Sequence, residues 1–251
     1  MIEIFNVKVF GLERAIVASG NPMTVGSIDT LNFETEYVVG NMDEPHVSIE
    51  THDYYKARAR AVKLGSSPNG SAHDHFLLGI HVQFDIKYPQ YWTVEAERYH
   101  NFEIISSQSK MHRLTIMGKD EKFNDMFNKY VDQRIIDIVK TKIDIYNKFK
   151  NIKQDKDGFY EFPEDYYGFL IQTKGKKVDK ASYDKIMYTI FMECVSNLPM
   201  GFEMMMTCDL TYLQLKTIYF QRRNHKLQED WGAFCDWCET LPMFKELIGI
   251  N

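Results

Sequence analysis

The chain has 251 residues, of which 44 % are hydrophobic and 26 % charged, with a formal net charge of -5. This hydrophobic content is enough for a full core, and the length allows one large domain or two small ones. The negative charge argues against general nucleic-acid binding. No apolar run approaches the ~20 residues of a membrane helix, and the first ten residues lack a basic leader with a long apolar core. We therefore expect a cytoplasmic protein that binds neither nucleic acid nor membrane.

Cysteine and histidine spacing gives no metal site or disulfide framework. The four cysteines are few and unevenly placed, with Cys235 and Cys238 close together as CDWC. This pair could be a redox pair or half of a metal site, but the same spacing is ordinary for small buried residues on a helix. No second CxxC is present, and the eight histidines do not form a zinc pattern. We expect no metal.

The first part of the chain alternates between strand and helix patterns. A β-rich run from Ile2 to Val9 predicts a strand with an irregularity near Asn6. A short helix should follow from Leu12 to about Ser19, because Gly20-Asn21-Pro22 is typical of a helix end. From Met23 to Asp53 the pattern is weak and irregular, with room for one hairpin.

A helix and a second strand are predicted next. Asp53 can cap a helix that runs to about Leu64. Alternating apolar residues from Ile80 to Ile86 then predict a half-buried strand. Its other face carries His81, Gln83 and Asp85, which are polar enough to line a site.

The segment from Arg98 to Arg113, RYHNFEIISSQSKMHR, concentrates two His, two Arg, a Lys, a Gln and three Ser. Hydroxyls, an amide and cations so close together could cradle an anionic ligand such as a nucleotide phosphate. The alternative is a polar surface loop after a strand. The position of the segment, after an alternating strand and an aromatic run, favours the ligand site.

The rest of the chain is predicted to be largely helical. Apolar residues recur at helical intervals from Asp120 to about Asn151, and a further helix runs from Ser182 through Cys194. Between them, about 152–180 is loop-rich and is either an insertion or a mobile lid. A core helix is expected from Met204 to Gln221, with a basic end at Arg222-Arg223 that suits the helix dipole.

The Arg98 to Arg113 segment resembles the signature RHRxxSxNExSxR of the flavin-dependent thymidylate synthases. Arg98-Tyr99-His100 falls where RHR begins, after a strand end at Phe84 to Pro89. Tyr99 stands for the central His and His100 for the second Arg. The run from Ser106 to Lys110 resembles the later half of the signature.

A second block is similar to the last conserved part of the same family. Leu198-Pro199 resembles its opening Leu-Pro, and counting onward without a gap places Arg222 on the arginine that grips the pyrimidine ring. Gln228 then falls in the Ala-Gln-x-Glu segment. The sequence departs from the family at Thr211 and Leu213, where an Asn and an Arg contact flavin.

The resemblance implies an α+β fold with a central, mostly antiparallel sheet flanked by helices and a long C-terminal helical part. It also implies a single domain over 1–251, with the loop-rich insertion at about 152–180, and a homotetramer with sites at subunit interfaces. The family transfers a one-carbon unit reductively to C5 of dUMP. Methylenetetrahydrofolate supplies the carbon, reduced FAD the hydride, and NADPH is a further co-substrate.

Carried over residue by residue, the resemblance makes Arg222 catalytic, because a guanidinium at a uracil carbonyl stabilises charge developing in the ring. It assigns the pyrimidine nucleotide to Ser106, Ser107, Gln108, Ser109, Lys110, Arg113 and Gln228. It assigns FAD to His75, Arg98 and His100, with His73 as an alternative to His75. Two other functions remain open: a nucleotide-binding or structural homologue that has lost flavin chemistry, and another methyl or hydroxymethyl transfer to a pyrimidine.

Overall fold

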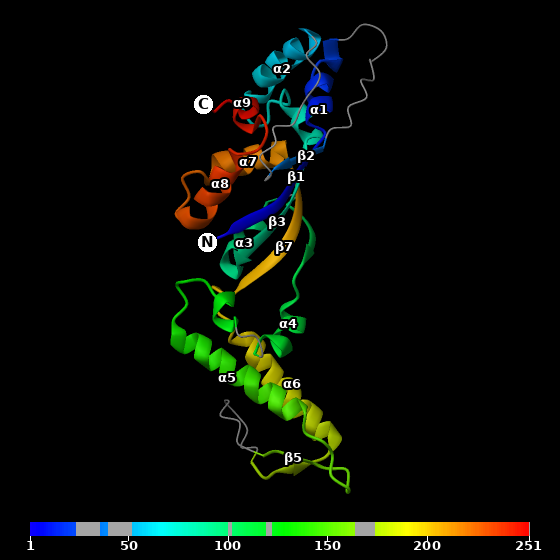
Figure 1. Ribbon diagram of the computed structural model, residues 1–251, viewed down its shortest axis with the longest axis vertical. Coiled ribbons are helices and arrows are strands. Elements are labelled where there is room, and N and C mark those ends of the chain that lie inside the picture. Colours follow the sequence, from blue (N-terminus) through cyan, green and yellow to red (C-terminus); the bar gives the residue numbers. More distant parts are fainter. Residues whose placement is uncertain (24–35, 40–51, 100–101, 119–121, 164–173, 251) are drawn as a thin grey trace. The chain divides into compact units, whose positions relative to one another are not determined.

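The computed structural model describes residues 1–23, 36–39, 52–99, 102–118, 122–163 and 174–250 (Figure 1). The chain divides into two compact units. The first comprises Met1–Tyr88, Trp92–Ser107 and Met205–Asn251, and the second Pro89–Tyr91 and Gln108–Met204. The single domain expected over 1–251 stays a prediction.

The first unit is built on a five-stranded sheet with the strand order β2-β1-β3-β7-β4. Strand β1 pairs antiparallel with both β2 and β3, and β4 pairs antiparallel with β7. The predicted α+β fold with a mostly antiparallel sheet is thereby confirmed. The strands are β1 (Glu3–Phe10), β2 (Glu36–Val39), β3 (His81–Pro89), β4 (Glu103–Ser107) and β7 (Glu203–Thr211).

The irregularity predicted near Asn6 is a bulge in β1. The register of β1 against β3 shifts between Phe5 and Lys8, and Asn6 has a φ of 54°. Asparagine tolerates this left-handed conformation better than most residues. The bulge also lets the Asn6 amide donate a hydrogen bond to the Asp85 carboxylate, at 2.7 Å.

Strand β3 alternates as predicted. Val82, Phe84 and Ile86 are buried, while His81 on the opposite face is exposed. The ring centroid of Phe84 lies 4.7 Å from that of Trp237, on helix α8 (Ala233–Cys238). This aromatic contact packs α8 against the apolar face of the sheet.

The core helix expected from Met204 to Gln221 is wrong in its first half. That half is strand β7, and helix α7 (Tyr212–Arg222) begins only afterwards. The reason is a period of two: Met204, Met206, Cys208 and Leu210 are all buried on one face of the strand. Methionine has good helix propensity, but burial of this alternating face overrides it.

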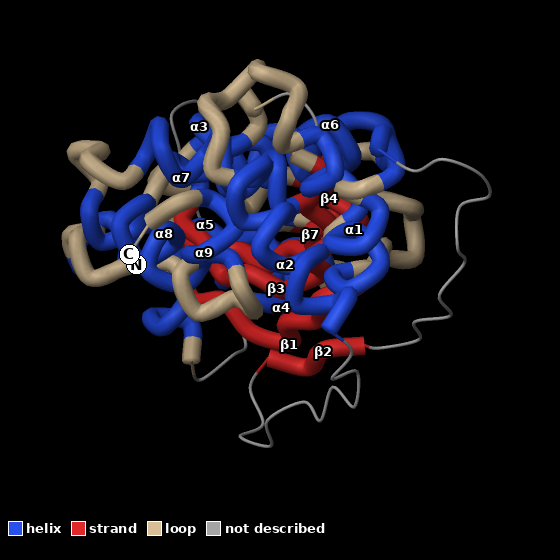
Figure 2. Tube along the Cα trace, turned by 90° about the horizontal axis from the view of Figure 1, so that it is seen from above, coloured by secondary structure: helices blue, strands red, loops and turns tan. Residues whose placement is uncertain are grey.

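The helices of the first unit agree with the other predictions near the N-terminus. Helix α1 (Leu12–Ala18) ends before Gly20 as expected, and it packs against α2 (His52–Gly65). Helix α2 also packs against the short helix α9 (Phe244–Ile248), and the three are seen together in Figures 1 and 2. The side chain of Asp53, and most of the irregular segment 23–53, lie outside the described residues.

The remaining elements of the first unit are short. A turn of 3-10 helix, η1 (Asn21–Met23), follows α1, and a second one, η2 (His75–Gly79), leads into β3. Helix α3 (Gln90–Ala96) follows β3, and a single π-helical turn, η4 (Gln228–Gly232), leads into α8.

The second unit contains helices α4 (Lys110–Met117), α5 (Gln133–Lys150) and α6 (Lys180–Ser196), which pack on one another. The helix expected from Asp120 begins later than predicted, at Gln133. Asp132 sets the start, because its carboxylate accepts a hydrogen bond from the Arg134 backbone N–H at 2.9 Å. Before it, the chain forms a 3-10 turn, η3 (Phe123–Met126), and an antiparallel bridge from Phe127 to Phe202.

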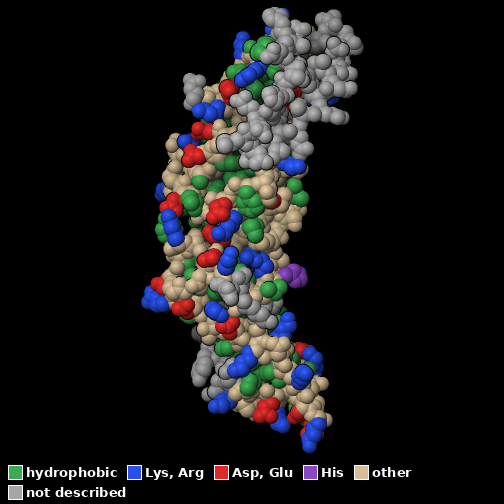
Figure 3. Space-filling model, viewed as in Figure 1, with side chains coloured by type: hydrophobic (Ala, Val, Ile, Leu, Met, Phe, Trp, Pro, Cys, Tyr) green, Lys and Arg blue, Asp and Glu red, His purple; other side chains and the backbone are tan. Residues whose placement is uncertain are grey.

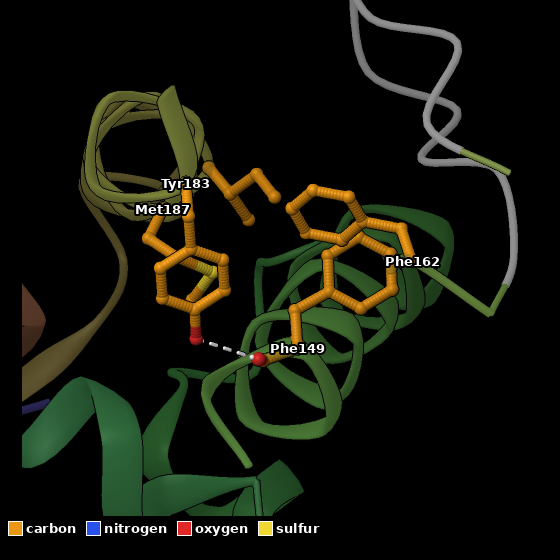
Figure 4. Close-up of a cluster of buried hydrophobic side chains, with 5 residues drawn as sticks. Phe149, Phe162, Tyr183 and Met187 are labelled. Atoms are coloured by element: carbon orange, nitrogen blue, oxygen red, sulfur yellow. Dashed lines mark hydrogen bonds between the residues drawn. The ribbon is translucent and has the colours of Figure 1, made fainter. Parts of the chain in front are cut away.

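The loop-rich segment 152–180 adds to the core of the second unit. Strands β5 (Tyr160–Glu161) and β6 (Lys177–Val178) pair antiparallel, and residues 164–173 lie outside the described part. The Tyr183 hydroxyl donates to the Phe149 carbonyl at 2.8 Å, which ties α6 to the end of α5 (Figure 4). The buried cluster consists of Phe149, Phe162, Tyr183, Met187 and Ile190.

The surface of the described residues carries mixed charge. On the face shown in Figure 3, Lys and Arg side chains are interspersed with Asp and Glu. No helix among the described residues is long and apolar enough to cross a membrane.

Candidate functional site

Arg222, the last residue of α7, contacts aromatic and acidic side chains of the first unit. Its Nη1 donates to Glu95 Oε2 at 3.0 Å, and its Nε donates to the Tyr99 hydroxyl at 2.6 Å. The guanidinium carbon lies 4.7 Å from the centroid of the Trp231 ring and 5.2 Å from that of Tyr99. The side chain is only 16 % exposed. Arg222 is therefore held in place by a charge pair and two cation–π contacts, unlike a surface arginine at a helix end.

Glu95 is the centre of this group. The oxygen that accepts from Arg222 also accepts from the Trp231 indole N–H at 2.8 Å, and it lies 3.4 Å from His225 Nε2. One carboxylate oxygen thus positions three side chains from α7 and the segment after it. Among the described residues, Arg222 Nη2 has no hydrogen-bond partner, so this amino group can still donate to a ligand oxygen.

Tyr99 stays protonated at neutral pH. Burial raises the pKa of its phenol, and the hydrogen bond and charge of Arg222 partly offset that rise. The neutral hydroxyl accepts from Arg222 and keeps its own proton for donation.

A pocket of about 220 Å³ adjoins this group, since Tyr99 belongs to both. Among the described residues, the lining carries no charged side chain. Most of its surface comes from aliphatic and aromatic groups, with one amide and one hydroxyl besides Tyr99. The lining residues are Leu78, Tyr99, Phe102, Leu210, Leu213, Gln214, Thr217 and Ile218.

A second polar group lies at the start of α4, within the second unit. The Ser109 hydroxyl caps the helix by accepting from the His112 backbone N–H at 3.4 Å. Lys110 Nζ donates to Gln90 Oε1 at 2.9 Å, and Arg113 Nη1 donates to Gln108 Oε1 at 2.6 Å. Two cations in the first turn of a helix add to the positive end of its dipole, so this end suits an anion.

Comparison with solved structures shows a likeness along nearly the whole chain. A crystal structure of flavin-dependent thymidylate synthase ThyX from Helicobacter pylori, complexed with FAD and dUMP, matches with a TM-score of 0.57 at 10 % identity. The match covers 98 % of this chain and 97 % of that one. A second crystal structure of the same enzyme with FAD and dUMP matches with a TM-score of 0.57 at 11 % identity, covering 99 % and 97 % of the two chains. No protein-family model matches the sequence, and no curated protein does.

This chain has the fold of the flavin-dependent thymidylate synthases. The sequence resemblance, which rested on two degenerate blocks, is confirmed at the level of the fold.

The structure places most of the positions that the resemblance connects with flavin, and their contact with FAD stays a prediction. Thr211 uses its hydroxyl to cap α7 in a capping box with Gln214, and Leu213 turns an apolar side chain to the pocket. His75 is exposed at the start of η2, and Arg98 is exposed after α3. His100 lies outside the described residues. Among the described residues, the pocket lining includes Leu213 and no cation.

The residues assigned to the nucleotide are divided between the two units. Ser106 and Ser107 are exposed on β4 of the first unit, whereas Gln108, Ser109, Lys110 and Arg113 belong to the second. Gln228 donates its amide to the carbonyl oxygens of residues 223 and 225, which fixes the turn after α7. The structure thus gives Gln228 a local structural role, and its contact with a nucleotide stays a proposal.

Sequence reasoning missed Glu95 and Trp231 as partners of Arg222. Glu95 stands in the aromatic run YWTVEA, where a partly buried carboxylate gains from a cation, and that was the available signal. Nothing in the sequence pointed to Trp231.

Proposed function

We propose that this protein binds dUMP or a related pyrimidine monophosphate on its thymidylate synthase-like fold. The observation that carries the proposal is the start of α4, where the capping Ser109, Lys110 and Arg113 share one helical turn. A helix N-terminus with two cations is a general phosphate site, and charge-assisted hydrogen bonds contribute more than neutral ones.

In this proposal the side chains from Ser106 to Lys110, together with Arg113, hold the phosphate. Arg222 donates through Nη2 to a ring oxygen, and Gln228 contributes to the same ligand. The proposal also keeps the homotetramer that the resemblance implies, with sites completed by a second subunit. Light scattering on the purified protein checks the oligomer directly.

Calorimetric titration with dUMP tests the binding. Ser109→Ala combined with Lys110→Ala should weaken affinity about tenfold or more, because two donors to the phosphate are removed. A matched pair on exposed α6 positions, Lys185→Ala with Ser196→Ala, should bind like the parent. Equal affinity in all three proteins would overturn the proposed phosphate site.

A second candidate function is the full reaction: reductive one-carbon transfer from methylenetetrahydrofolate to C5 of dUMP or a related nucleotide, with FAD and NADPH. The observation that favours it is the match over 98 % of the chain to an enzyme solved with FAD and dUMP. Thr211 and Leu213 argue against it, because they stand where the family has an Asn and an Arg that contact flavin. The non-catalytic nucleotide-binding homologue is the form that these two residues favour.

Flavin absorbance separates the two candidates. A flavoenzyme should purify yellow, or gain FAD absorbance and a higher melting temperature after incubation with FAD, since a tight ligand stabilises the folded state. A colourless protein that binds dUMP and gains no stability from FAD is the non-catalytic form. Formation of dTMP from dUMP in the complete mixture would establish the enzyme.

A further inference from the structure

We propose that the pocket beside Tyr99 binds an uncharged aromatic molecule of one or two rings. This inference concerns the pocket of the first unit alone, so it does not depend on the phosphate site proposed at α4. It follows from the mismatch between the lining and a flavin dinucleotide.

The size of the pocket sets the upper limit on the ligand. Its volume is about 220 Å³, whereas pockets for drug-sized ligands usually measure about 300–1,000 Å³. An engineered apolar cavity of about 150 Å³ holds benzene. The pocket therefore has room for one ring or a compact fused pair, and is too small to enclose a dinucleotide.

The described part of the lining offers no partner to a charged ligand. Among the described residues, the lining has no cation or carboxylate, and the guanidinium of Arg222, which contacts the lining residue Tyr99, is paired with Glu95 at 3.0 Å. A charge placed in such a pocket would lose hydration without gaining a partner.

The polar atoms of the lining are committed to the protein. Gln214 Oε1 accepts from the Thr211 backbone N–H at 2.6 Å and from its hydroxyl at 3.1 Å. The Thr217 hydroxyl donates to the Leu213 carbonyl at 3.0 Å. The Tyr99 hydroxyl accepts from Arg222 Nε at 2.6 Å, so most of the surface that remains for a ligand is apolar.

Two aromatic walls favour a flat ligand over an aliphatic one. Tyr99 and Phe102 both line the pocket, and Phe102 is itself held edge-to-face against Trp92, with the ring centroids 6.1 Å apart. Aromatic pairs attract one another beyond the effect of the area they bury, in edge-to-face and offset-stacked arrangements.

Ligand-observed NMR and calorimetry with indole as the probe test the proposal, with riboflavin and FAD as comparisons. Indole should bind the wild-type protein, and Leu213→Trp should reduce its affinity at least tenfold by filling the pocket. Gln221→Trp, on the exposed side of the same helix, is the matched control and should bind indole like the parent.

Leu213→Phe serves as a milder variant if Leu213→Trp lowers the melting temperature. Leu213→Arg, which places the cation that the resemblance expects, should also weaken indole binding. Absence of indole binding to the wild type, or equal binding to Leu213→Trp and Gln221→Trp, would overturn the proposal. Uptake of FAD that Leu213→Trp abolishes would overturn it as well, and would leave the α4 phosphate site untouched.

Discussion

Asp74 and Lys216, 142 positions apart in the sequence, form a buried ion pair with 2.6 Å between Oδ2 and Nζ. Each side chain is 2 % exposed. Lys216 also donates to the carbonyl oxygens of Gly65 and Ser67, at 2.7 and 2.6 Å. All three ammonium hydrogens have acceptors, so α7 is tied to the end of α2 and to the turn before η2.

Removing one partner of this pair should destabilise the first unit strongly. Asp74→Ala leaves a buried ammonium without its counter-charge, and losses of about 3–5 kcal/mol in the free energy of unfolding are usual for such changes. Urea denaturation measures the loss. His73→Ala, at the exposed neighbouring position, should change stability by less than about 0.5 kcal/mol. Similar losses in both variants would contradict the special role of the pair.

The boundary between β7 and α7 gives a second prediction. The Thr211 hydroxyl accepts from the Gln214 backbone N–H at 3.3 Å, and the Gln214 side chain accepts from the Thr211 backbone N–H in return. Thr211→Ala should cost about 0.5–2 kcal/mol of stability, the usual range for loss of an N-cap. Thr211→Ser keeps the hydroxyl and should recover most of the loss. An alanine variant as stable as the parent would show that the cap contributes nothing here.

The same boundary explains what the sequence could and could not predict. Strand β3 was predictable because its buried residues alternate with His81, Gln83 and Asp85. Strand β7 has the same period, but Met205 breaks the pattern with an exposed apolar side chain. A run of methionines therefore resembles a helix until the cap at Thr211 is taken into account.

The Arg222 group shows the same limit for the site. The basic end of helix α7 at Arg222 was predictable, since arginine suits the C-terminus of a helix. Its partners were not, because Glu95 and Tyr99 lie 127 and 123 positions away and only the fold brings them to the guanidinium. The apolar nature of the pocket could be suspected only from Leu213.

The cysteines should be chemically inert in the native protein. Burial raises the pKa of the Cys194 and Cys208 thiols to about 12 and that of Cys235 to about 11, and it raises that of Cys238 well above its ordinary value. The thiolate is the reactive form, so Ellman's reagent at pH 8 should label none of the four until denaturant is added. Rapid labelling of Cys235 or Cys238 in the native state would revive the redox function considered for CDWC.

Tyr219 predicts a loss of stability at alkaline pH. Burial, followed by the hydrogen bond that its hydroxyl donates to Glu239 at 2.7 Å, raises the pKa of this phenol to about 12. The unfolded chain releases that proton near pH 10, so folding favours the protonated form. Stability contributed by Tyr219 is present below pH 10 and is lost as the pH rises through 12.

Urea denaturation between pH 9 and 12 checks this dependence. Tyr219→Phe should reduce the fall in stability by up to about 1.4 kcal/mol per pH unit in that window. Tyr188→Phe, which changes an exposed phenol on α6, is the matched control and should leave the slope as in the parent. If both variants keep the parent slope, Tyr219 is not the source.

Arg222→Lys separates ligand binding from stability. Lysine keeps the charge and can still pair with Glu95. It lacks the planar guanidinium, which donates to Tyr99 through Nε and has Nη2 available for a ligand. Affinity for dUMP should therefore fall about tenfold or more, while the free energy of unfolding falls by much less than the 3–5 kcal/mol of a broken buried pair.

Arg223→Lys is the control for this last prediction, because Arg223 pairs with Asp236 and Glu239 at the more exposed edge of the same helix end. It should leave affinity for dUMP unchanged. If Arg222→Lys lowers stability and leaves affinity intact, the guanidinium serves only to lock α7 onto Glu95, and the ring of the nucleotide must be held elsewhere. If affinity falls alone, Nη2 is the donor that the ligand uses.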